Sequence, residues 1–364
     1  MTINKEFWKG KRVLVTGHTG FKGSWLCLWL CEMGAKITGI SLEPDTHPAL
    51  FTQLDLANKI HEHHIADIRD LGTIKNVVNE SQPEVVIHLA AQPLVRQSYE
   101  DPLNTWSTNV QGSLNVLEGL KRVQHHCAVV MVTTDKVYEN KGWVYGYREN
   151  DRLGGHDPYS ASKAAAELAI ASWRSSFCGQ QKHQTTCLAV ATARAGNVIG
   201  GGDWAENRII PDAIRALTRS QPVPVRNPHA TRPWQHVLEP LSGYLCLAQA
   251  LAGIKMKGIG SNEICSPFNF GPYMEANKNV QQLIEESLRH WTGSWIDQSN
   301  KEAPHEAERL GLEIEKARQY LGWEPKWNFA MTIERTITWY KEIENGGNPY
   351  SACVKDIQEY NLLN

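Results

Sequence analysis

A tyrosine and a lysine spaced four residues apart are the first candidates for chemistry in this chain. Tyr159 and Lys163 follow Asp157-Pro158, and the alanine-rich run after them predicts a helix. Residues i and i+4 share one face of a helix, so both side chains would point the same way. A lysine ammonium beside a tyrosine hydroxyl favours the phenolate and lowers a pKa that is otherwise about 10. The pair could therefore take a proton from an alcohol whose carbon loses hydride, although a surface lysine over a packed tyrosine has the same spacing.

Three glycines near the start of the chain indicate where a hydride acceptor would bind. Residues 12–15 form an apolar run typical of a buried parallel strand, and a second apolar run at 25–30 predicts a helix. Gly17, Gly20 and Gly23 lie between these runs. Glycines in a strand–loop–helix unit permit a tight turn and let backbone N–H groups approach a pyrophosphate at the helix N-terminus. We therefore expect a dinucleotide-binding loop rather than a purely structural turn.

The end of the second predicted strand, residues 36–42, indicates which dinucleotide binds. An acidic residue commonly holds the adenosine ribose about 20 residues beyond the glycines. Ser41 stands at that position with Glu43 close behind, and neither Arg nor Lys follows to hold a 2′-phosphate. The expected cofactor is therefore NAD rather than NADP, with a looser hold on the ribose because the usual aspartate is absent.

Strands and helices alternate through the first half of the chain. Further strands are expected to end at 65–68 and to run over 84–91, 128–133 and 186–193, with helices at 71–79 and 104–123 between them. This alternation predicts an α/β fold, a doubly wound parallel sheet of the Rossmann type. Residues 1–200 would form the NAD-binding domain, to which some later segments return. Residues 201–364, where the alternation loosens, would form a smaller α/β substrate-binding part.

Polar residues follow the fifth predicted strand and recur in the second half. Thr134, Asp135 and Lys136 come directly after that strand. Ligands of such sheets bind at the carboxyl ends of the strands, so these side chains should face the cofactor cleft. Guanidinium groups at Arg194, Arg208, Arg226 and Arg232 suit a second pyrophosphate, and hence a nucleotide-linked substrate, although any single one is more often a surface charge.

Composition excludes several other classes of function. The chain has 364 residues and a formal net charge of -2, which gives no reason to bind nucleic acid or an anionic membrane. No apolar run is long enough to span a membrane and no secretory signal is visible, so a cytoplasmic protein is expected. The eight cysteines are scattered, and Cys27 and Cys31 have no second pair to complete a metal site. His61, His63 and His64 are expected to be solvated, and no metal is expected.

Taken in order, these motifs resemble those of the extended short-chain dehydrogenase/reductases that act on nucleotide sugars. The match spans nearly the whole chain: Gly-x-x-Gly-x-x-Gly from Gly17, Asp67-Ile68, residues 88–91, Tyr159-x-x-x-Lys163, Arg194-x-x-Asn197 and Arg232-x-Trp234. A threonine and an aspartate ahead of the tyrosine helix mark the 4,6-dehydratases within that family. Residues 92–99 and 134–136 are most similar to the branch that acts on CDP-glucose, which supplies deoxysugars of the O-antigen and lipopolysaccharide kind.

The resemblance implies a role for each matching residue. The cofactor side of the cleft would be formed by Gly17, Gly20, Phe21, Lys22, Gly23, Ser41, Asp67, Ile68, Leu89, Ala90, Ala91, Tyr159 and Lys163. The substrate side would be formed by Gln92, Arg194, Asn197, Arg208, Arg232 and Asn269. A homodimer is implied, with the helices over 104–123 and 159–177 forming a four-helix bundle, and a dimer of dimers is the alternative.

The implied reaction is oxidation at sugar C4, loss of water across C5 and C6, and return of hydride to C6. Tyr159 would act on the 4-hydroxyl with Thr134 beside it, and Asp135 would be the general acid if apolar surroundings keep it protonated. Lys136 departs from the family, which usually carries a glutamate base there. It would be either a lysine of lowered pKa that takes the C5 proton or a cation that stabilises the enolate.

Two other readings share the fold. A nucleotide-sugar 4-epimerase would use the same cofactor, Tyr159 and Lys163, but would have no use for an acid–base pair at positions 135 and 136. A non-catalytic dinucleotide sensor usually loses the tyrosine or the lysine, and this chain keeps both.

Overall fold

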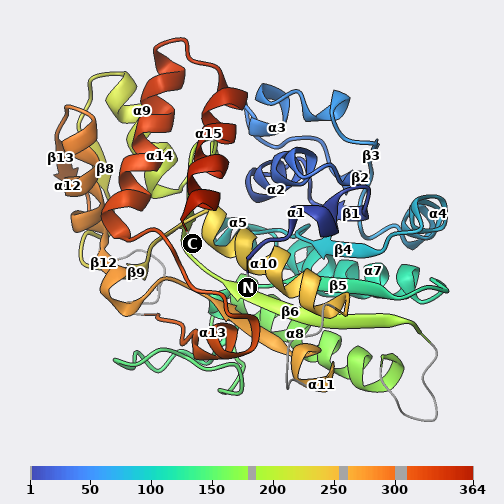
Figure 1. Ribbon diagram of the computed structural model, residues 1–364. Helices are drawn as coiled ribbons and strands as arrows, with labels where there is room; N and C mark the ends of the chain where they lie inside the picture. The colour runs from blue at the N-terminus through green and yellow to red at the C-terminus, as the bar shows by residue number, and fades with distance from the viewer. Residues whose placement is uncertain (1, 179–185, 254–260, 300–309, 364) are drawn as a thin grey trace.

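A seven-stranded parallel sheet forms the centre of the molecule (Figure 1). The structure is a computed structural model that describes residues 2–178, 186–253, 261–299 and 310–363. The strand order is β11-β6-β5-β4-β1-β2-β3. The strands are β1 (Arg12–Thr16), β2 (Lys36–Ser41), β3 (Glu62–Ile65), β4 (Val85–His88), β5 (Cys127–Val132), β6 (Leu188–Ala195) and β11 (Pro267–Phe270). The chain reverses its direction of winding between β1 and β4, which confirms the predicted doubly wound sheet.

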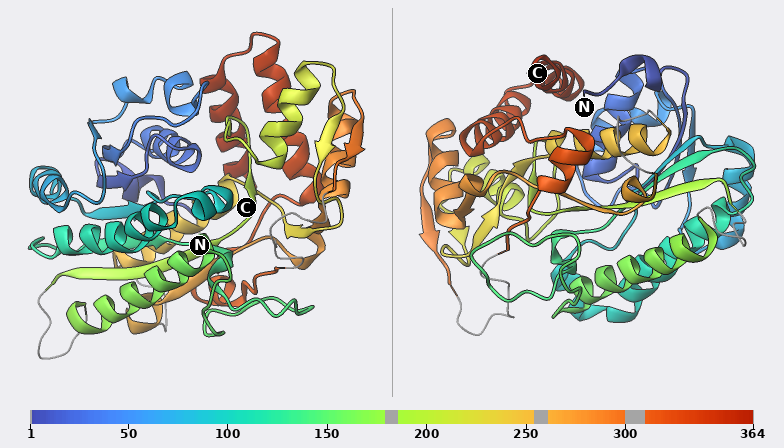
Figure 2. Two further views of the ribbon diagram at one scale, coloured as in Figure 1. Left: turned by 180° about the vertical axis from the view of Figure 1, so that it is seen from behind. Right: turned by 60° about the horizontal axis from the view of Figure 1, so that its bottom comes forward.

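Alternate residues of each strand feed two separate apolar cores. In β1, Val13 and Val15 belong to a core with α2 (Phe21–Glu32) and α10 (Leu238–Leu251), whereas Leu14 belongs to a core on the other face. That second core contains residues of α4 (Leu71–Ser81), α7 (Ser113–Leu120) and α8 (Pro158–Phe177). Both faces are therefore covered, as the two views in Figure 2 show. This explains why the strands are apolar throughout rather than alternating.

Helix α8 begins where the sequence predicts. The Asp157 side chain caps it by accepting from the backbone N–H of Ser160, and Pro158 occupies the first turn. The predicted helix over 104–123 is present but is not uniform. It comprises α6 (Pro102–Trp106), a π-helical segment (Ser107–Gly112) and α7. Such π-helical turns are frequent at functional sites.

The second half supplies a mixture of helices and short strand pairs. Strands β7 (Val198–Ile199) and β10 (Gln235–His236), β8 (Val223–Val225) and β13 (Trp295–Asp297), and β9 (Thr231–Pro233) and β12 (Asn277–Asn279) form three small sheets. The larger helices are α9 (Ile209–Thr218), α12 (Val280–His290), α13 (Glu315–Leu321), α14 (Phe329–Glu344) and α15 (Pro349–Leu362). Short helices α1 (Lys5–Trp8), α3 (Leu50–Gln53), α5 (Val95–Glu100) and α11 (Ser261–Ile264) complete the fold. Strand β11 and helix α10 return to the main sheet, and the division near residue 200 stays a prediction.

The histidines near the end of the third predicted strand differ in their surroundings. His63 lies in β3, and its Nδ1 is 2.7 Å from Nε2 of the buried His18 in the glycine loop. His61 is exposed, in line with the expectation that these histidines are mostly solvated, and His63 and His64 are half-buried. Strand β3 ends at Ile65, so Asp67 and Ile68 follow the strand rather than finishing it.

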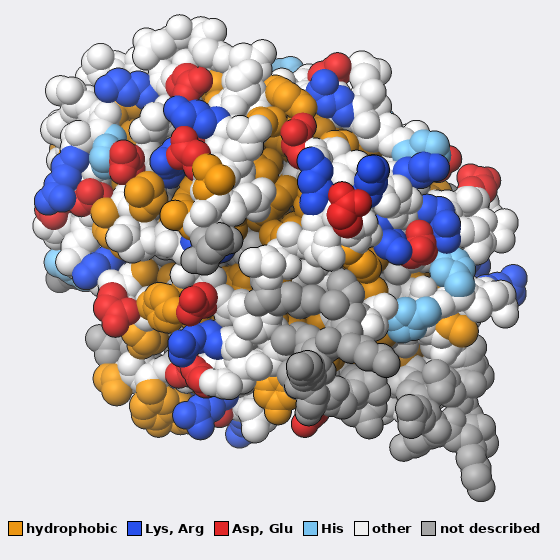
Figure 3. Space-filling model, in the orientation of Figure 1, with side chains coloured by type: hydrophobic (Ala, Val, Ile, Leu, Met, Phe, Trp, Pro, Cys, Tyr) orange, Lys and Arg blue, Asp and Glu red, His pale blue; other side chains and the backbone are white. Residues whose placement is uncertain are grey.

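The face of the protein drawn in Figure 3 has no strong bias towards one sign of charge. Lys and Arg side chains are interspersed with Asp and Glu on the face drawn in Figure 3. Within the described ranges, no helix is long and apolar enough to cross a membrane. The eight cysteines are all free thiols. No group of three or more His, Cys, Asp or Glu side chains could hold a metal ion among the described residues.

Candidate active site

The glycine loop packs directly on the chain that follows β4. Gly17 has a φ of +76°, and a Cβ there would lie 2.7 Å from the backbone nitrogen of Ala90. A Cβ on Gly23 would lie 2.1 Å from the carbonyl oxygen of Gly17. Only glycine permits both approaches. Since β1 and β4 flank the reversal in the sheet, the loop forms a narrow cradle at the place where dinucleotides bind in such folds, and it fits a pyrophosphate at the start of α2.

The other predicted cofactor residues lie at neighbouring strand ends, with different surroundings. Ser41 ends β2, and its Oγ lies 2.7 Å from the Thr19 hydroxyl of the glycine loop. Asp67 binds the Arg69 guanidinium through both carboxylate oxygens, at 3.0 and 2.9 Å from Nε. Ile68 is buried in the core beneath α7, where Gly112 leaves room for it. Leu89, Ala90 and Ala91 follow β4 beside the loop.

Tyr159 and Lys163 are both buried on α8, at the edge of the sheet where β5 ends. Lys163 Nζ donates to the carbonyl oxygen of Val132 at 3.3 Å. Burial lowers the pKa of Lys163 to about 8, and the Glu167 carboxylate opposes this shift. Burial also raises the pKa of Tyr159 to about 12, while a hydrogen bond with Thr134 lowers it. The prediction that the tyrosine pKa lies below 10 is therefore wrong for this structure, because burial outweighs the favourable neighbours.

Thr134, Asp135 and Lys136 form a hydrogen-bonded chain that starts at Tyr159. The Thr134 hydroxyl, which also bonds Tyr159, donates to Asp135 Oδ1 at 2.9 Å. Lys136 Nζ donates to the same oxygen, also at 2.9 Å. Asp135 has no exposed surface, whereas the Lys136 side chain is 27% exposed. An ammonium and a hydroxyl thus bind one Asp135 oxygen, whereas its buried Oδ2 has no hydrogen-bond partner among the described residues. Whether Asp135 acts as the general acid stays a prediction.

Cationic side chains lie around these hydrogen-bonded residues. Lys22 at the start of α2 is close enough to Arg208, Lys163, Lys136 and Asp135 for their charges to act on it. Burial, then the neighbouring cations, lower the pKa of Lys22 to about 7. Arg208 precedes α9, binds Asp203 at 2.9 Å and acts on Tyr159. A site that concentrates positive charge beside a buried acid suits an anionic, phosphate-bearing ligand.

Three of the predicted substrate residues use their hydrogen bonds within the protein. Arg194 is buried in β6 and binds Glu167, Tyr138 and the carbonyl oxygen of Glu149. Asn269 binds Tyr138 and the carbonyl oxygens of Tyr147 and Glu313. Gln92 binds Leu94 and Thr105. None of these hydrogen bonds involves the Tyr159 side chain, and a role of the three residues in substrate binding stays a prediction.

Of the remaining three predicted substrate residues, Arg208 is described above, and Asn197 and Arg232 are placed differently. Asn197 has a φ of +47°, and its buried Oδ1 has no hydrogen-bond partner among the described residues, so this oxygen remains available. Arg232 lies in β9 and donates to the carbonyl oxygen of Thr231.

Two residues of the site were not predicted from the sequence. Asn109, in the π-helical segment, donates to the Ser162 hydroxyl at 2.9 Å, and Ser162 in turn donates to the carbonyl oxygen of Tyr159. Gly196 packs against Asp135, because a Cβ there would lie 2.0 Å from the carboxyl carbon. Asn109 stands among many other polar residues of its helix, and Gly196 is a small residue after a buried strand, so neither position specifies its partner from the sequence.

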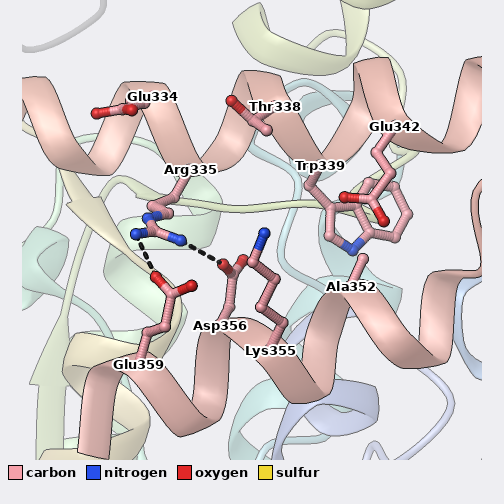
Figure 4. A pocket seen from close by; sticks show the side chains of 9 residues that line it. All are labelled: Glu334, Arg335, Thr338, Trp339, Glu342, Ala352, Lys355, Asp356 and Glu359. Atoms are coloured by element: carbon pink, nitrogen blue, oxygen red, sulfur yellow. Dashed lines mark ion pairs between the residues drawn. The ribbon is translucent and has the colours of Figure 1, made fainter. Parts of the chain in front are cut away.

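A cavity of about 270 Å³ between α14 and α15 is separate from this site (Figure 4). Arg335 of α14 forms ion pairs with Asp356, at 3.6 Å, and with Glu359, both on α15. Helix α15 packs against α2, on the face of the sheet opposite α8. These paired charges hold the two helices together.

Comparisons with known proteins agree with the fold and identify the family. The family described as GDP-mannose 4,6 dehydratase matches residues 14–336. The chain is 47% identical to the CDP-glucose 4,6-dehydratase of Salmonella typhimurium strain LT2, over 98% of both chains. It is 28% identical to the dTDP-glucose 4,6-dehydratase of Haemophilus influenzae, over 90% of this chain and 97% of that one.

Solved structures share the fold at lower identity. The dTDP-glucose 4,6-dehydratase of Bacillus anthracis, in complex with NAD, has a TM-score of 0.72 at 21% identity and covers 93% of this chain and 99% of its own. The UDP-glucose 4-epimerase of Thermotoga maritima has a TM-score of 0.75 at 21% identity and covers 91% of this chain and 99% of its own. These likenesses confirm the predicted α/β architecture. With the family match over most of its length and a relative at nearly half identity, the chain belongs to the GDP-mannose 4,6 dehydratase family of nucleotide-sugar 4,6-dehydratases.

Proposed function

We propose that this protein is an NAD-dependent hydro-lyase that converts CDP-glucose to CDP-4-keto-6-deoxyglucose. The observation that carries the proposal is the hydrogen-bonded chain from Tyr159 through Thr134 to Asp135 and Lys136. It joins a group suited to oxidising C4 with a pair suited to removing water across C5 and C6. The nucleotide rests on the 47% identity to the Salmonella CDP-glucose 4,6-dehydratase. The cofactor rests on the glycine cradle and on Ser41, with no 2′-phosphate ligand following it.

Tyr159 is the group that takes the proton of the 4-hydroxyl. Its pKa of about 12 means that the free phenolate is rare at neutral pH, so nearby cations must favour it when substrate binds. The Thr134 hydroxyl can add to this only by turning its proton from Asp135 to Tyr159. Lys163 is the buried cation on the same helix face, and Arg208 is a second one. Bound NAD would supply the oxidant for C4 and the hydride that returns to C6. That return would need one proton at C5, taken from solvent, and Tyr159 would release the proton of the 4-hydroxyl to solvent. The 4-keto group then makes the C5 proton acidic.

Asp135 and Lys136 act as one proton-sharing unit in the elimination. Transfer of a proton over the 2.9 Å from Lys136 Nζ to Asp135 Oδ1 converts an ion pair into an amine and a carboxylic acid. The exposed amine takes the C5 proton, the C5–H electron pair forms the C5–C6 double bond, and the C6–O bond breaks. Lys136 passes a proton to the leaving hydroxyl, water departs, and Asp135 returns its proton to the amine. The pair thus ends as it began.

A charged Lys136 that only stabilises the enolate is the alternative to this route. In that case another group takes the C5 proton, and Asp135 fixes the ammonium. The two routes differ in whether C5 exchanges its proton when Lys136 is removed, which the last prediction in the Discussion measures.

We also propose that the protein works as a cytoplasmic homodimer. The support is a group of exposed apolar side chains on the helices predicted to pair: Leu103 on α6 is 81% exposed and Leu168 on α8 is 62% exposed. Helix α6 packs against α8, so these side chains belong to neighbouring helices of one layer. An apolar surface of this kind is typical of an association site.

The experiment that tests the function is a substrate panel. The purified protein is incubated with NAD and, in separate reactions, with CDP-glucose, dTDP-glucose, UDP-glucose and GDP-mannose. A 4-keto-6-deoxy sugar gives an ultraviolet chromophore in alkali, and we expect it with CDP-glucose. Conversion of a sugar to its C4 epimer without the chromophore would indicate an epimerase. Binding of dinucleotide with no conversion of any sugar would indicate a sensor, and either result would overturn the proposal.

A further inference from the structure

A buried ion pair lies beneath α8, one helical turn beyond Lys163. Glu167 Oε2 is 2.8 Å from Arg194 Nη2, and Oε1 is 3.0 Å from Arg194 Nε. Both side chains are only 2% exposed. The guanidinium therefore grips the carboxylate through two parallel bonds in a site closed to water, a geometry that gives orientation as well as energy.

Two threonines complete the shell around the Glu167 carboxylate. Thr133 Oγ1 donates to Oε1 at 2.5 Å and Thr192 Oγ1 donates to Oε2 at 2.8 Å. Burial alone would raise the pKa of Glu167, but Arg194 and the two hydroxyls outweigh it, so the pKa lies below its usual value. The carboxylate therefore stays charged across the physiological range of pH.

Arg194 has a second set of partners that anchor it. Its Nη1 donates to the Tyr138 hydroxyl at 2.9 Å and to the carbonyl oxygen of Glu149 at 2.8 Å. Tyr138 lies two residues after Lys136, and Thr133 directly precedes Thr134. The ion pair is thus joined to the segment that carries the acid–base residues and to the helix that carries Tyr159 and Lys163.

The charges around Lys163 make a buried carboxylate necessary. Lys22 of α2 faces it, and His88 of β4 also faces it but stays neutral because burial lowers its pKa to about 3. Arg174 of α8 and Arg194 of β6 lie close enough to Glu167 for their charges to act on it. Burial draws the Lys163 ammonium towards its neutral form, and among the described residues Glu167 is the carboxylate that opposes this.

We propose that Glu167, fixed and kept ionised by Arg194, holds the Lys163 ammonium in its charged form and so sets the upper pH limit of the oxidation step. Glu167 and Arg194 are positioning residues in this account, because neither reaches the Tyr159 hydroxyl. The inference rests on the proposed function, in which a charged Lys163 supports the Tyr159 phenolate. It also assigns Arg194 a role other than substrate binding.

The test compares wild type with Glu167→Gln, which keeps the side-chain shape and removes the charge. In protein labelled with [ε-13C]lysine, the Lys163 resonance is assigned by its loss in Lys163→Met and is titrated by NMR. We expect the midpoint to fall by about one pH unit or more in Glu167→Gln. The rate of single-turnover NADH formation should decline at high pH, and the midpoint of that decline should move down by the same number of pH units. Glu239→Gln, which alters a buried carboxyl of α10 that is bound to Tyr360 and Trp327, is the matched control and should move neither.

A second variant covers the case in which Glu167→Gln does not fold, since it leaves the Arg194 charge buried without its partner. Glu167→Gln/Arg194→Met removes both charges and should also lower the midpoint, by less than Glu167→Gln does, because loss of the Arg194 cation opposes loss of the carboxylate. A merely structural role would reduce the rate at every pH without moving the midpoint. An unchanged Lys163 midpoint in a folded variant would overturn the inference. The NMR titration needs no turnover, so it decides this point even if no nucleotide sugar is converted.

Discussion

Lys136 Nζ lies 2.9 Å from Asp135 Oδ1, yet only the lysine reaches the cleft: its side chain is 27% exposed and that of the aspartate is fully buried. The exposed member of the pair can meet substrate, and the buried member can store a proton out of reach of water. A substitution at either position should therefore affect the same step, elimination, and should leave the oxidation by Tyr159 intact.

Tyr159→Phe and Lys163→Met should each abolish oxidation at C4 while the protein stays folded. The first removes the proton acceptor and the second removes the buried cation beside it. We expect the rate of NADH formation on mixing with CDP-glucose to fall by about 10² or more, in the range typical of general acid–base groups. Far-ultraviolet circular dichroism checks the fold. Substantial turnover by either folded variant would remove the central role given to this pair.

Gly196→Ala should damage elimination more than oxidation. The new methyl group would lie 2.0 Å from the Asp135 carboxyl carbon, so Asp135 must leave its place between Thr134 and Lys136. We expect chromophore formation to fall by about 10² or more while NADH still forms. Gly154→Ala is the matched control, because its methyl group would meet nothing closer than Glu139 Cβ at 3.4 Å. Equal activity in the two variants would contradict the placement of Asp135.

Buried histidines should make the fold sensitive to acid. Burial lowers the pKa of His18 to about 4 and those of His88 and His236 to about 3, against an ordinary value of 6.5. Between 6.5 and these values the unfolded chain binds more protons than the folded chain, so the free energy of unfolding falls as pH is lowered. Each histidine should contribute about 1.4 kcal/mol per pH unit in that window.

The variant that checks the acid sensitivity is His236→Phe, which keeps an aromatic ring between Trp25 and Trp327. Urea unfolding is measured at several values between pH 7 and pH 4.5, and the free energy of unfolding is plotted against pH. The slope of that plot should be smaller in His236→Phe than in wild type by the contribution of one proton. A slope equal to that of wild type would mean that His236 titrates normally in the folded chain.

The exposed apolar side chains on α6 and α8 should be buried between two subunits. Light scattering at micromolar concentration should give twice the mass of one chain, and Leu168→Glu should shift the protein towards the monomer because it places a charge in the interface. Leu362→Glu is the control, since that leucine is 78% exposed at the far end of α15. A monomeric wild-type protein would refute the predicted bundle.

The elements that the sequence predicts well are those whose cause is local. The apolar runs, the glycine spacing and the Asp157-Pro158 start of α8 each act within a few residues, and the sheet, the loop and the helix follow from them. The roles of Arg194 and Asn269 depend on partners far away along the chain. Glu167 lies 27 residues from Arg194, and Asn269 meets Tyr138 across 131 residues. An arginine that binds phosphate and one that binds a buried carboxylate have the same local sequence.

Tertiary packing also decides the features that local patterns describe wrongly. The π-helical segment that brings Asn109 to Ser162 interrupts a helix whose apolar spacing looks regular. His63 reads as part of a polar run before a strand, but the neighbouring strand places it against His18. The Tyr159 pKa depends on burial by segments that lie far away in sequence, so the nearby lysine alone gives the wrong direction.

The central claim is that Tyr159 acts at C4 while the Asp135–Lys136 pair, through the lysine, acts at C5 and C6. A single-turnover experiment on Lys136→Met in deuterium oxide tests it most directly. Absorbance follows NADH, and mass spectrometry follows the 6-deoxy product and deuterium at C5, with Asp135→Asn run in parallel. We predict that both variants accumulate enzyme-bound NADH and 4-keto sugar with little product. Deuterium should enter C5 much more slowly than in wild type in both, because Lys136→Met removes the amine and Asp135→Asn removes the carboxylate that takes the lysine's proton. Rapid exchange in Lys136→Met would leave the lysine only its role as a cation. Failure of both variants to form NADH would contradict the division of labour itself.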